Sequence, residues 1–180
     1  MVKKQQHGFT LLELLGTMSI AAILVAFAVP AMTSTLKNSR MNSSVNDLVS
    51  SFNFARNEAV RRGVEVTVCR STDGIVCTDA ADWATGWIVT ADVNGDGTFE
   101  NSFDELFRVS EALSSGLQFI KSNAARVVYD VSGGAKDAGG NAITSTLTLC
   151  DSSQDGERGY RVTIAVTGHV SSRKLDPSDC

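Results

Sequence analysis

The sequence predicts an α+β protein in which one long N-terminal helix packs against a C-terminal antiparallel β domain. Three observations support this fold class. Residues 14–29 carry no charge and form an apolar run. Residues 45–59 repeat apolar side chains at helical spacing, and from Val64 onward apolar residues alternate between turn signals. A long helix followed by short strands favours one antiparallel sheet, or two small sheets, packed on that helix.

The apolar run near the N-terminus predicts a transmembrane segment over about residues 9–31. A helix needs about 20 apolar residues to cross a bilayer, and this run is close to that length. Lys3 and Lys4 precede it, and basic residues favour the cytoplasmic side. We therefore expect the first residues in the cytoplasm and the remainder of the chain on the far side of the membrane.

Glu13 lies inside this apolar run. A carboxylate at the centre of a membrane helix costs about 2.5–3.5 kcal/mol on insertion scales, so an intramembrane acid indicates a functional site with a partner. A free N-terminal amine on a neighbouring copy is the natural cation. That amine lies at the right depth only if the chain is cleaved just before Phe9.

The segment from His7 to Glu13, with Gly8, Phe9 and an acid at fixed spacing beside the apolar run, resembles the type IV prepilin class III signal. The resemblance implies that residues 1–8 form a leader. A prepilin peptidase would cut after Gly8, and the same enzyme class would N-methylate Phe9. It also implies that Glu13 acts in assembly and that Pro30 bends the helix.

A conventional secretory signal peptide is the alternative, because Ala26-Phe27-Ala28 has the small-x-small pattern of a cleavage site. Two features argue against it. Glu13 would lie in the apolar core of that signal, and the helical pattern continues beyond the supposed cut.

The helical pattern continues from the predicted transmembrane segment to Arg62. This gives one helix over residues 9–62 with a length of about 80 Å. Its second half is amphipathic, with one face suited to a globular core. Pro30 removes a backbone hydrogen bond and is expected to bend the helix, and Gly63 is well placed to end it. The apolar positions of the second half are Val45, Leu48, Val49, Phe52, Ala55 and Ala59.

Residues 63–180 have the pattern of a β-rich domain. Val64, Val66 and Val68 alternate with polar residues, and later runs are separated by Gly, Asn and Asp turn signals. The further strands are expected at residues 86–91, 105–110, 126–131, 145–150 and 160–166, with a short one near 169–174.

Charge and cysteine content favour an exported, acidic domain. The net charge is −4, and loss of the two leader lysines would make it −6, which argues against a surface that binds nucleic acid throughout. Four cysteines on the exported side indicate two disulfides in an oxidising compartment. Of the three possible connectivities we favour Cys69–Cys77, across a short hairpin, and Cys150–Cys180, which would hold the C-terminus in place.

The exported part resembles the GspH/FimT branch of minor pilins and pseudopilins. The resemblance implies a type IV pilin-like fold and a low-copy subunit whose helix joins a fibre core while its β domain faces outward. The motifs that carry it are Cys69-Arg70-Ser71, Asp73-Gly74, Cys77, Trp83-x-x-Gly86-Trp87-Ile88-Val89, Asp92-x-Asn94-x-Asp96-Gly97, Arg108-Val109 and Thr167-Gly168.

Asp92, Asn94 and Asp96 resemble the opening of a calcium loop, in which hard oxygen ligands surround the ion. The twelfth position of such a loop requires Glu but is Phe103 here. A polar hairpin turn is the favoured interpretation, because Asn-Gly and Asp-Gly are turn dipeptides. We therefore expect no metal and no other cofactor.

The C-terminal region holds candidates for other functions. A hydrolytic triad around His169 is not favoured, because no serine has a nucleophile-elbow signature. The FimT relatives that bind DNA carry Gly-Arg-x-Arg, whereas this chain has Gly168-His169-Val170-Ser171. Weak or absent DNA binding is therefore expected. The basic candidates for it are Arg158, Arg161, His169, Arg173 and Lys174.

These features together favour a structural subunit rather than an enzyme. We expect a minor pilin in the bacterial inner membrane, with its β domain in the periplasm, that later enters a pilus and helps to start or cap it. Its partners would be other major and minor pilins or pseudopilins. A type II secretion pseudopilin and a DNA-binding minor pilin remain alternatives.

Overall fold

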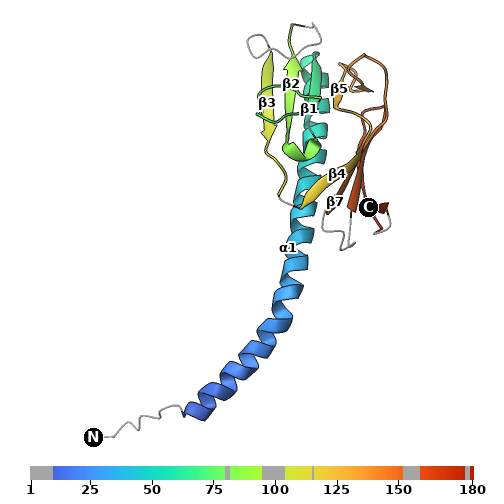
Figure 1. Cartoon of the computed structure of the whole chain (residues 1–180). Coiled ribbons are helices and arrows are strands. Elements are labelled where there is room, and N and C mark those ends of the chain that lie inside the picture. Colours follow the sequence, from blue (N-terminus) through green and yellow to red (C-terminus); the bar gives the residue numbers. More distant parts are fainter. Residues whose placement is uncertain (1–9, 80–81, 95–103, 115, 152–158, 177–178) are drawn as a thin grey trace, which may run out of the picture. The chain divides into compact units, whose positions relative to one another are not determined.

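The computed structural model describes residues 10–79, 82–94, 104–114, 116–151, 159–176 and 179–180, except for the side chains of residues 29–31 and 34. The described chain divides into two compact units, Met1–Ser39 and Arg40–Cys180. Both contain part of one continuous helix, α1 (Leu11–Arg62) (Figure 1). The helix continues through Pro30, and the bend expected there stays a prediction.

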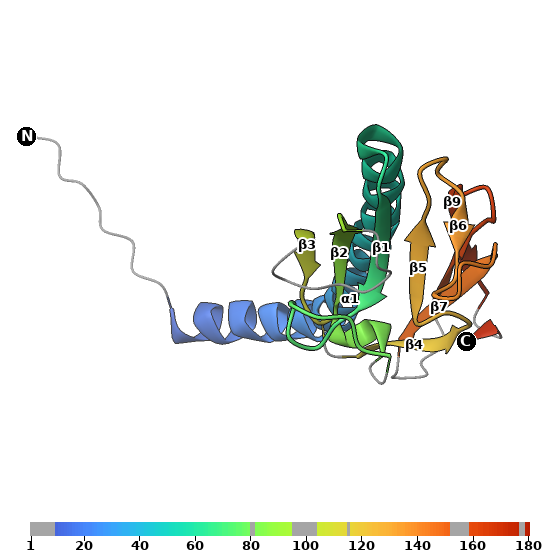
Figure 2. The ribbon, with the colours of Figure 1, turned by 90° about the horizontal axis from the view of Figure 1, so that it is seen from above.

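Nine strands form two antiparallel sheets in the described part of the second unit. Sheet A has the order β3-β2-β1-β5-β6, and sheet B has the order β4-β7-β8-β9. Figure 2 shows β1 and β2 beside the second half of α1. The strands are β1 (Glu65–Arg70), β2 (Trp87–Asp92), β3 (Glu105–Ser110), β4 (Leu117–Ser122), β5 (Arg126–Tyr129), β6 (Ala135–Lys136), β7 (Ser145–Asp151), β8 (Gly159–Ile164) and β9 (Val170–Leu175).

The second half of α1 and both sheets share one hydrophobic core. The stripe that the sequence indicated is buried: Leu48, Phe52 and Ala55 have at most 1% of their surface exposed. Val49 is only partly buried and packs at the edge of this core. Val66 of sheet A and Leu147 of sheet B belong to the same cluster. Because residues of the helix and of both sheets belong to one buried cluster, the helix is an integral part of the β domain's core.

The two tryptophans, Trp83 and Trp87, are core residues. Trp83 lies in a single 3-10 turn, η1 (Trp83–Thr85), and Trp87 lies in β2. The Trp83 indole N–H donates to the Ala124 carbonyl at 3.0 Å, and that of Trp87 donates to the Ser51 hydroxyl at 3.0 Å. Both polar atoms are therefore satisfied within the core.

Arg56 connects α1 to turns from both sheets. Its Nε donates to the Gly133 carbonyl at 3.0 Å, in the turn after β5, and its NH2 group donates to the Thr167 carbonyl at 3.1 Å, in the β8–β9 turn. Gly168 has a φ of +78°, and an added Cβ there would lie 1.8 Å from the Gly133 carbonyl oxygen. The two turns therefore approach each other so closely that only glycine fits at residue 168.

Two strands were missed in the sequence, β4 and β6. In β4 the register shifts between Phe119 and Lys121, and this irregularity breaks the two-residue alternation. β6 contains only two residues and pairs with β5. Both strands are recognisable only once their partners are in place, because pairing rather than local pattern defines them.

Candidate functional site

The N-terminal end of α1 is capped by Thr10. The Thr10 hydroxyl accepts a hydrogen bond from the Glu13 backbone N–H at 3.2 Å, so Thr10 occupies the N-cap and Glu13 the third helical position. An acid at that position also favours the helix macrodipole. This local role for Glu13 was not recognised from the sequence, although Thr-x-x-Glu is the capping-box pattern. Gly8 and Phe9 lie outside the described residues.

The first part of α1 exposes an apolar surface. Residues Leu11–Ala28 have a mean hydropathy of 2.1 and no buried residue, and by length and composition they could span a membrane. Five of its large apolar side chains are each more than half exposed. They are Leu14, Leu15, Ile20, Ile23 and Leu24. No described residue of the chain buries this surface, and an exposed apolar surface of this kind is typical of sites of membrane or protein contact.

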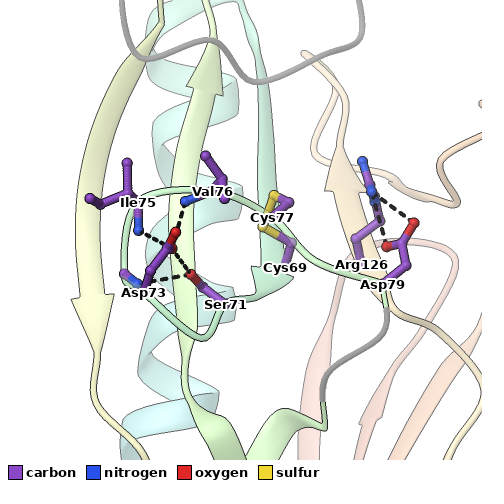
Figure 3. Close-up of a disulfide and its surroundings, with 9 residues drawn as sticks. Cys69, Ser71, Asp73, Ile75, Val76, Cys77, Asp79 and Arg126 are labelled. Carbon is purple, nitrogen blue, oxygen red and sulfur yellow. Dashed lines mark hydrogen bonds and ion pairs between the residues drawn. A yellow bond between two sulfur atoms is a disulfide. The ribbon is translucent and has the colours of Figure 1, made fainter.

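The first disulfide, Cys69–Cys77, closes a loop over the outer face of sheet A (Figure 3). The pairing is the one favoured from the sequence, but Cys77 lies in a loop and not in the second strand of a hairpin, so that expectation was wrong. The loop packs against Val109, and a Cβ at Gly74 would lie 2.8 Å from that side chain. Ile88, on the outer face, is fully buried. The loop therefore supplies cover for a small apolar cluster outside the main core.

Polar contacts stiffen the same loop, as Figure 3 shows. The Asp73 carboxylate accepts hydrogen bonds from the backbone N–H groups of Ile75 and Val76, at 2.8 and 3.0 Å. These two hydrogen bonds hold the pKa of Asp73 below its usual value, and the one from Ile75 contributes most. Arg126 forms an ion pair with Asp79 at 2.9 Å, just beyond the disulfide.

The second disulfide, Cys150–Cys180, anchors the C-terminal segment to β7. The bond lies against β8 at Gly159, where an added Cβ would be 2.2 Å from the Cys180 sulfur. Leu175 pairs with Gly159 and is buried at 4% exposure. This pairing is also the one favoured from the sequence, and it fixes the ends of β7, β8 and β9 together.

The basic candidates of the C-terminal region do not form one patch. Val162 and Ile164 face the core, so Arg161 points to the outer face of sheet B, and Arg173 is directly opposite it on β9. Lys174 follows Arg173, so it belongs to the other face of the strand. Arg161 and Arg173 therefore lie together, and Lys174 lies apart from them. His169 is exposed in the β8–β9 turn, and Arg158 lies outside the described residues.

A further cation joins the outer face of sheet B, and sequence reasoning missed it. Lys121 on β4 pairs with Thr148 on β7, Thr148 pairs with Arg161, and Arg161 pairs with Arg173. The four residues form one row across the sheet, which we call the cationic row. Lys121 is distant from the arginines in sequence, and only strand register brings it beside them.

The calcium candidates are only partly described. Asp92 ends β2, and Asn94 lies two residues beyond it. Between them, the Val93 N–H donates a hydrogen bond to the Asp104 carboxylate at 2.9 Å. Asp96 lies outside the described residues. Within the described ranges no three His, Cys, Asp or Glu residues are grouped so that they could hold a metal ion.

Comparison with protein families gives two matches. Residues 44–168 match the family described as type II transport protein GspH, and residues 3–29 match the prokaryotic N-terminal methylation motif. The first match covers more than half of the chain and most of the described β domain. A search of curated proteins finds no match.

Two solved structures share the fold. The type IV minor pilin FimU of Pseudomonas aeruginosa is 17% identical, with a TM-score of 0.54 over 80% of this chain and 93% of that one. The minor pseudopilin EpsH, from the type 2 secretion system of Vibrio cholerae, is also 17% identical. Its TM-score is 0.50 over 77% of this chain and 98% of that one. The pilin-like α+β fold expected from the sequence is thereby confirmed.

Proposed function

The chain belongs to the GspH family of type II transport proteins, a structural and non-enzymatic pilin-type family, and we propose that it is a minor pilin that helps to start or cap a type IV pilus. The observation that carries this proposal is the exposed apolar half of α1 with Glu13 in its first turn. Such a helix needs either a bilayer or a bundle of similar helices around it. A subunit that moves from the inner membrane into a fibre uses both environments.

Processing at the N-terminus is the first requirement of this proposal. The match to the methylation motif over residues 3–29 supports cleavage after Gly8 and methylation of Phe9 by the prepilin peptidase. Replacing Gly8 by a bulky residue should leave the leader attached, because the peptidase site would have to accommodate a new side chain. Mass spectrometry should find methylated Phe9 as the first residue of the mature chain, and a mature N-terminus at Val29 would contradict the proposal.

Glu13 carries the assembly step. In the membrane its carboxylate costs insertion energy, and in a fibre the methylated amine of a neighbour's Phe9 offsets this cost in a low-dielectric layer. Glu13→Gln keeps the size and the helical position of the side chain but removes the charge. We expect this variant to insert and to be processed, but to copurify poorly with other pilins. Normal fibre assembly by the variant would contradict the proposed role.

A type II secretion pseudopilin is the second candidate, and the name of the matching family favours it. The same anchor and the same processing serve both machines, so neither separates them. The partners do. Copurification of the full-length protein in mild detergent, from cells that contain both machines, should recover type IV pilins. Recovery of type II secretion pseudopilins alone would select the second candidate.

A further inference from the structure

The outer face of sheet B carries positive charge without a matching acid at its described outward positions. Apart from the residues beside the second disulfide, those positions on β7, β8 and β9 contain threonine, serine and arginine, and β4 adds Lys121. Asp151 ends β7, but strand alternation places it on the opposite face. Within the part of the chain that the structure describes, the side chains of Lys121, Arg161 and Arg173 make no ion pair. The nearest described acids along the chain, Asp176 and Asp179, follow the end of β9.

The pairing of Arg161 with Arg173 is unfavourable for the isolated domain. The two residues are directly opposite on neighbouring antiparallel strands, where like charges repel each other. The chain has a net charge of −4, so acids are abundant elsewhere, yet among the described residues of the sheet B strands none shares this face with the two arginines to offset the repulsion. An anionic group bound from outside would do so.

The cationic row is held in an extended arrangement. Thr148 lies between Lys121 and Arg161 and is only 2% exposed although it faces away from the helix. The aliphatic parts of the two neighbouring cations can account for this cover while their charged ends reach solvent. Strands are about 4.8 Å apart, so the row extends about 14 Å from β4 to β9.

A second row of hydroxyl groups runs beside the first. Thr146, Thr163 and Ser171 pair with one another across β7, β8 and β9. Each lies two residues along its strand from a member of the cationic row, and therefore on the same face. Their side chains are the size and polarity that a flat, polar protein contact requires. The cationic row and this hydroxyl row together form what we call the sheet B face.

We propose that the sheet B face docks an acidic surface of a partner protein, with side-chain carboxylates placed against Arg161 and Arg173. Arginine binds a carboxylate through two parallel hydrogen bonds, and carboxylates one helical turn apart, about 5–6 Å, match the separation of the two strands. Three cations are few for a nucleic acid, whose affinity grows with each phosphate neutralised, and the acidic chain as a whole repels that polymer. A protein carboxylate cluster is smaller and fits the row.

The test compares two adjacent residues that share exposure and charge but face opposite sides of β9. Full-length protein in a neutral detergent is titrated against fluorescent poly-L-glutamate and, separately, against a DNA duplex of matched charge, at low and at physiological salt. Arg173→Gln alone should weaken poly-L-glutamate binding, and Arg161→Gln with Arg173→Gln should weaken it about five- to tenfold. Lys174→Gln should change it by less than about twofold. Lys121→Gln should lie between the two.

Three results would overturn the proposal. Equal losses from Lys174→Gln and Arg173→Gln would mean that overall charge, not this face, attracts the probe. Absence of poly-L-glutamate binding by the unaltered protein would remove the carboxylate site. Tighter binding of DNA than of poly-L-glutamate at physiological salt, lost in the double arginine variant, would assign the face to nucleic acid. Thermal unfolding of each variant shows that a lost signal does not reflect a lost fold.

Discussion

Removal of the Arg56 guanidinium should loosen the connection between the helix and both sheets. Arg56→Met keeps an unbranched stem of similar length but deletes the donors that reach Gly133 and Thr167. Hydrogen bonds from a charged donor contribute about 1.5–3 kcal/mol each when well buried, and Arg56 is only half-buried. We therefore expect the free energy of unfolding to fall by about 2–4 kcal/mol, which corresponds to a drop in Tm of about 5–15 °C.

The measurement is thermal unfolding of the full-length, oxidised protein in neutral detergent, followed by the β-sheet signal in circular dichroism. Arg61→Met on the same helix is the matched control, because Arg61 is exposed and, among the described residues, forms its ion pair with Glu58 across one turn. That change should cost less than about 1 kcal/mol. If the two variants unfold at the same temperature, the contacts of Arg56 do not stabilise the domain and the reasoning fails.

Three other perturbations test the domain. In chemical unfolding, replacing both cysteines of one disulfide by serine should lower the free energy of unfolding. The expected loss is about 2.5 kcal/mol for Cys69–Cys77, which are 8 residues apart, and about 3.5 kcal/mol for Cys150–Cys180, which are 30 residues apart. Ser51→Ala should lower the free energy of unfolding by about 1–3 kcal/mol in the same assay, because it leaves the buried indole N–H of Trp87 without its acceptor. Adding Trp87→Phe to this variant removes the unpaired N–H, and the double variant should therefore lose less than the sum of the two single losses. Hydrogen bonding, first from the Ser132 hydroxyl, lowers the pKa of Asp130 to about 2, so its contribution is full above about pH 4 and is lost as the pH falls toward 2. The Asp130→Asn variant should therefore show a flatter decline of stability over that range, and an unchanged decline would exclude this carboxylate as its cause.

The elements with a strong periodic pattern could be predicted from the sequence. The stripe through Leu48, Phe52 and Ala55 has helical spacing, and all three residues are buried. The strand at Glu105–Ser110 has the bounds that were expected. Where a segment's own pattern matches its final environment, local reasoning is sufficient.

Strand register could not be predicted, and the candidate sites depend on it. Nothing in the local sequence shows that Lys121 lies in line with Arg161, because the irregularity before Lys121 sets which face it occupies. For the same reason Arg173 and Lys174 were grouped in the sequence although alternation places them on opposite faces. The loop closed by the first disulfide was expected as a hairpin, because spacing shows that two cysteines can meet but not what the intervening chain covers.

The packing of the second half of α1 against both sheets has a mechanical consequence. A tensile force transmitted along the helix would reach sheet A and sheet B at the same time, since core residues of both contact residues 41–59. The helix could slide out only if many contacts broke together in shear, with the Arg56 contacts to the two turns acting as cross-ties. The load would thus be divided between the sheets, and the two disulfides would limit how far the chain that follows β1 and β7 could extend once either sheet began to yield.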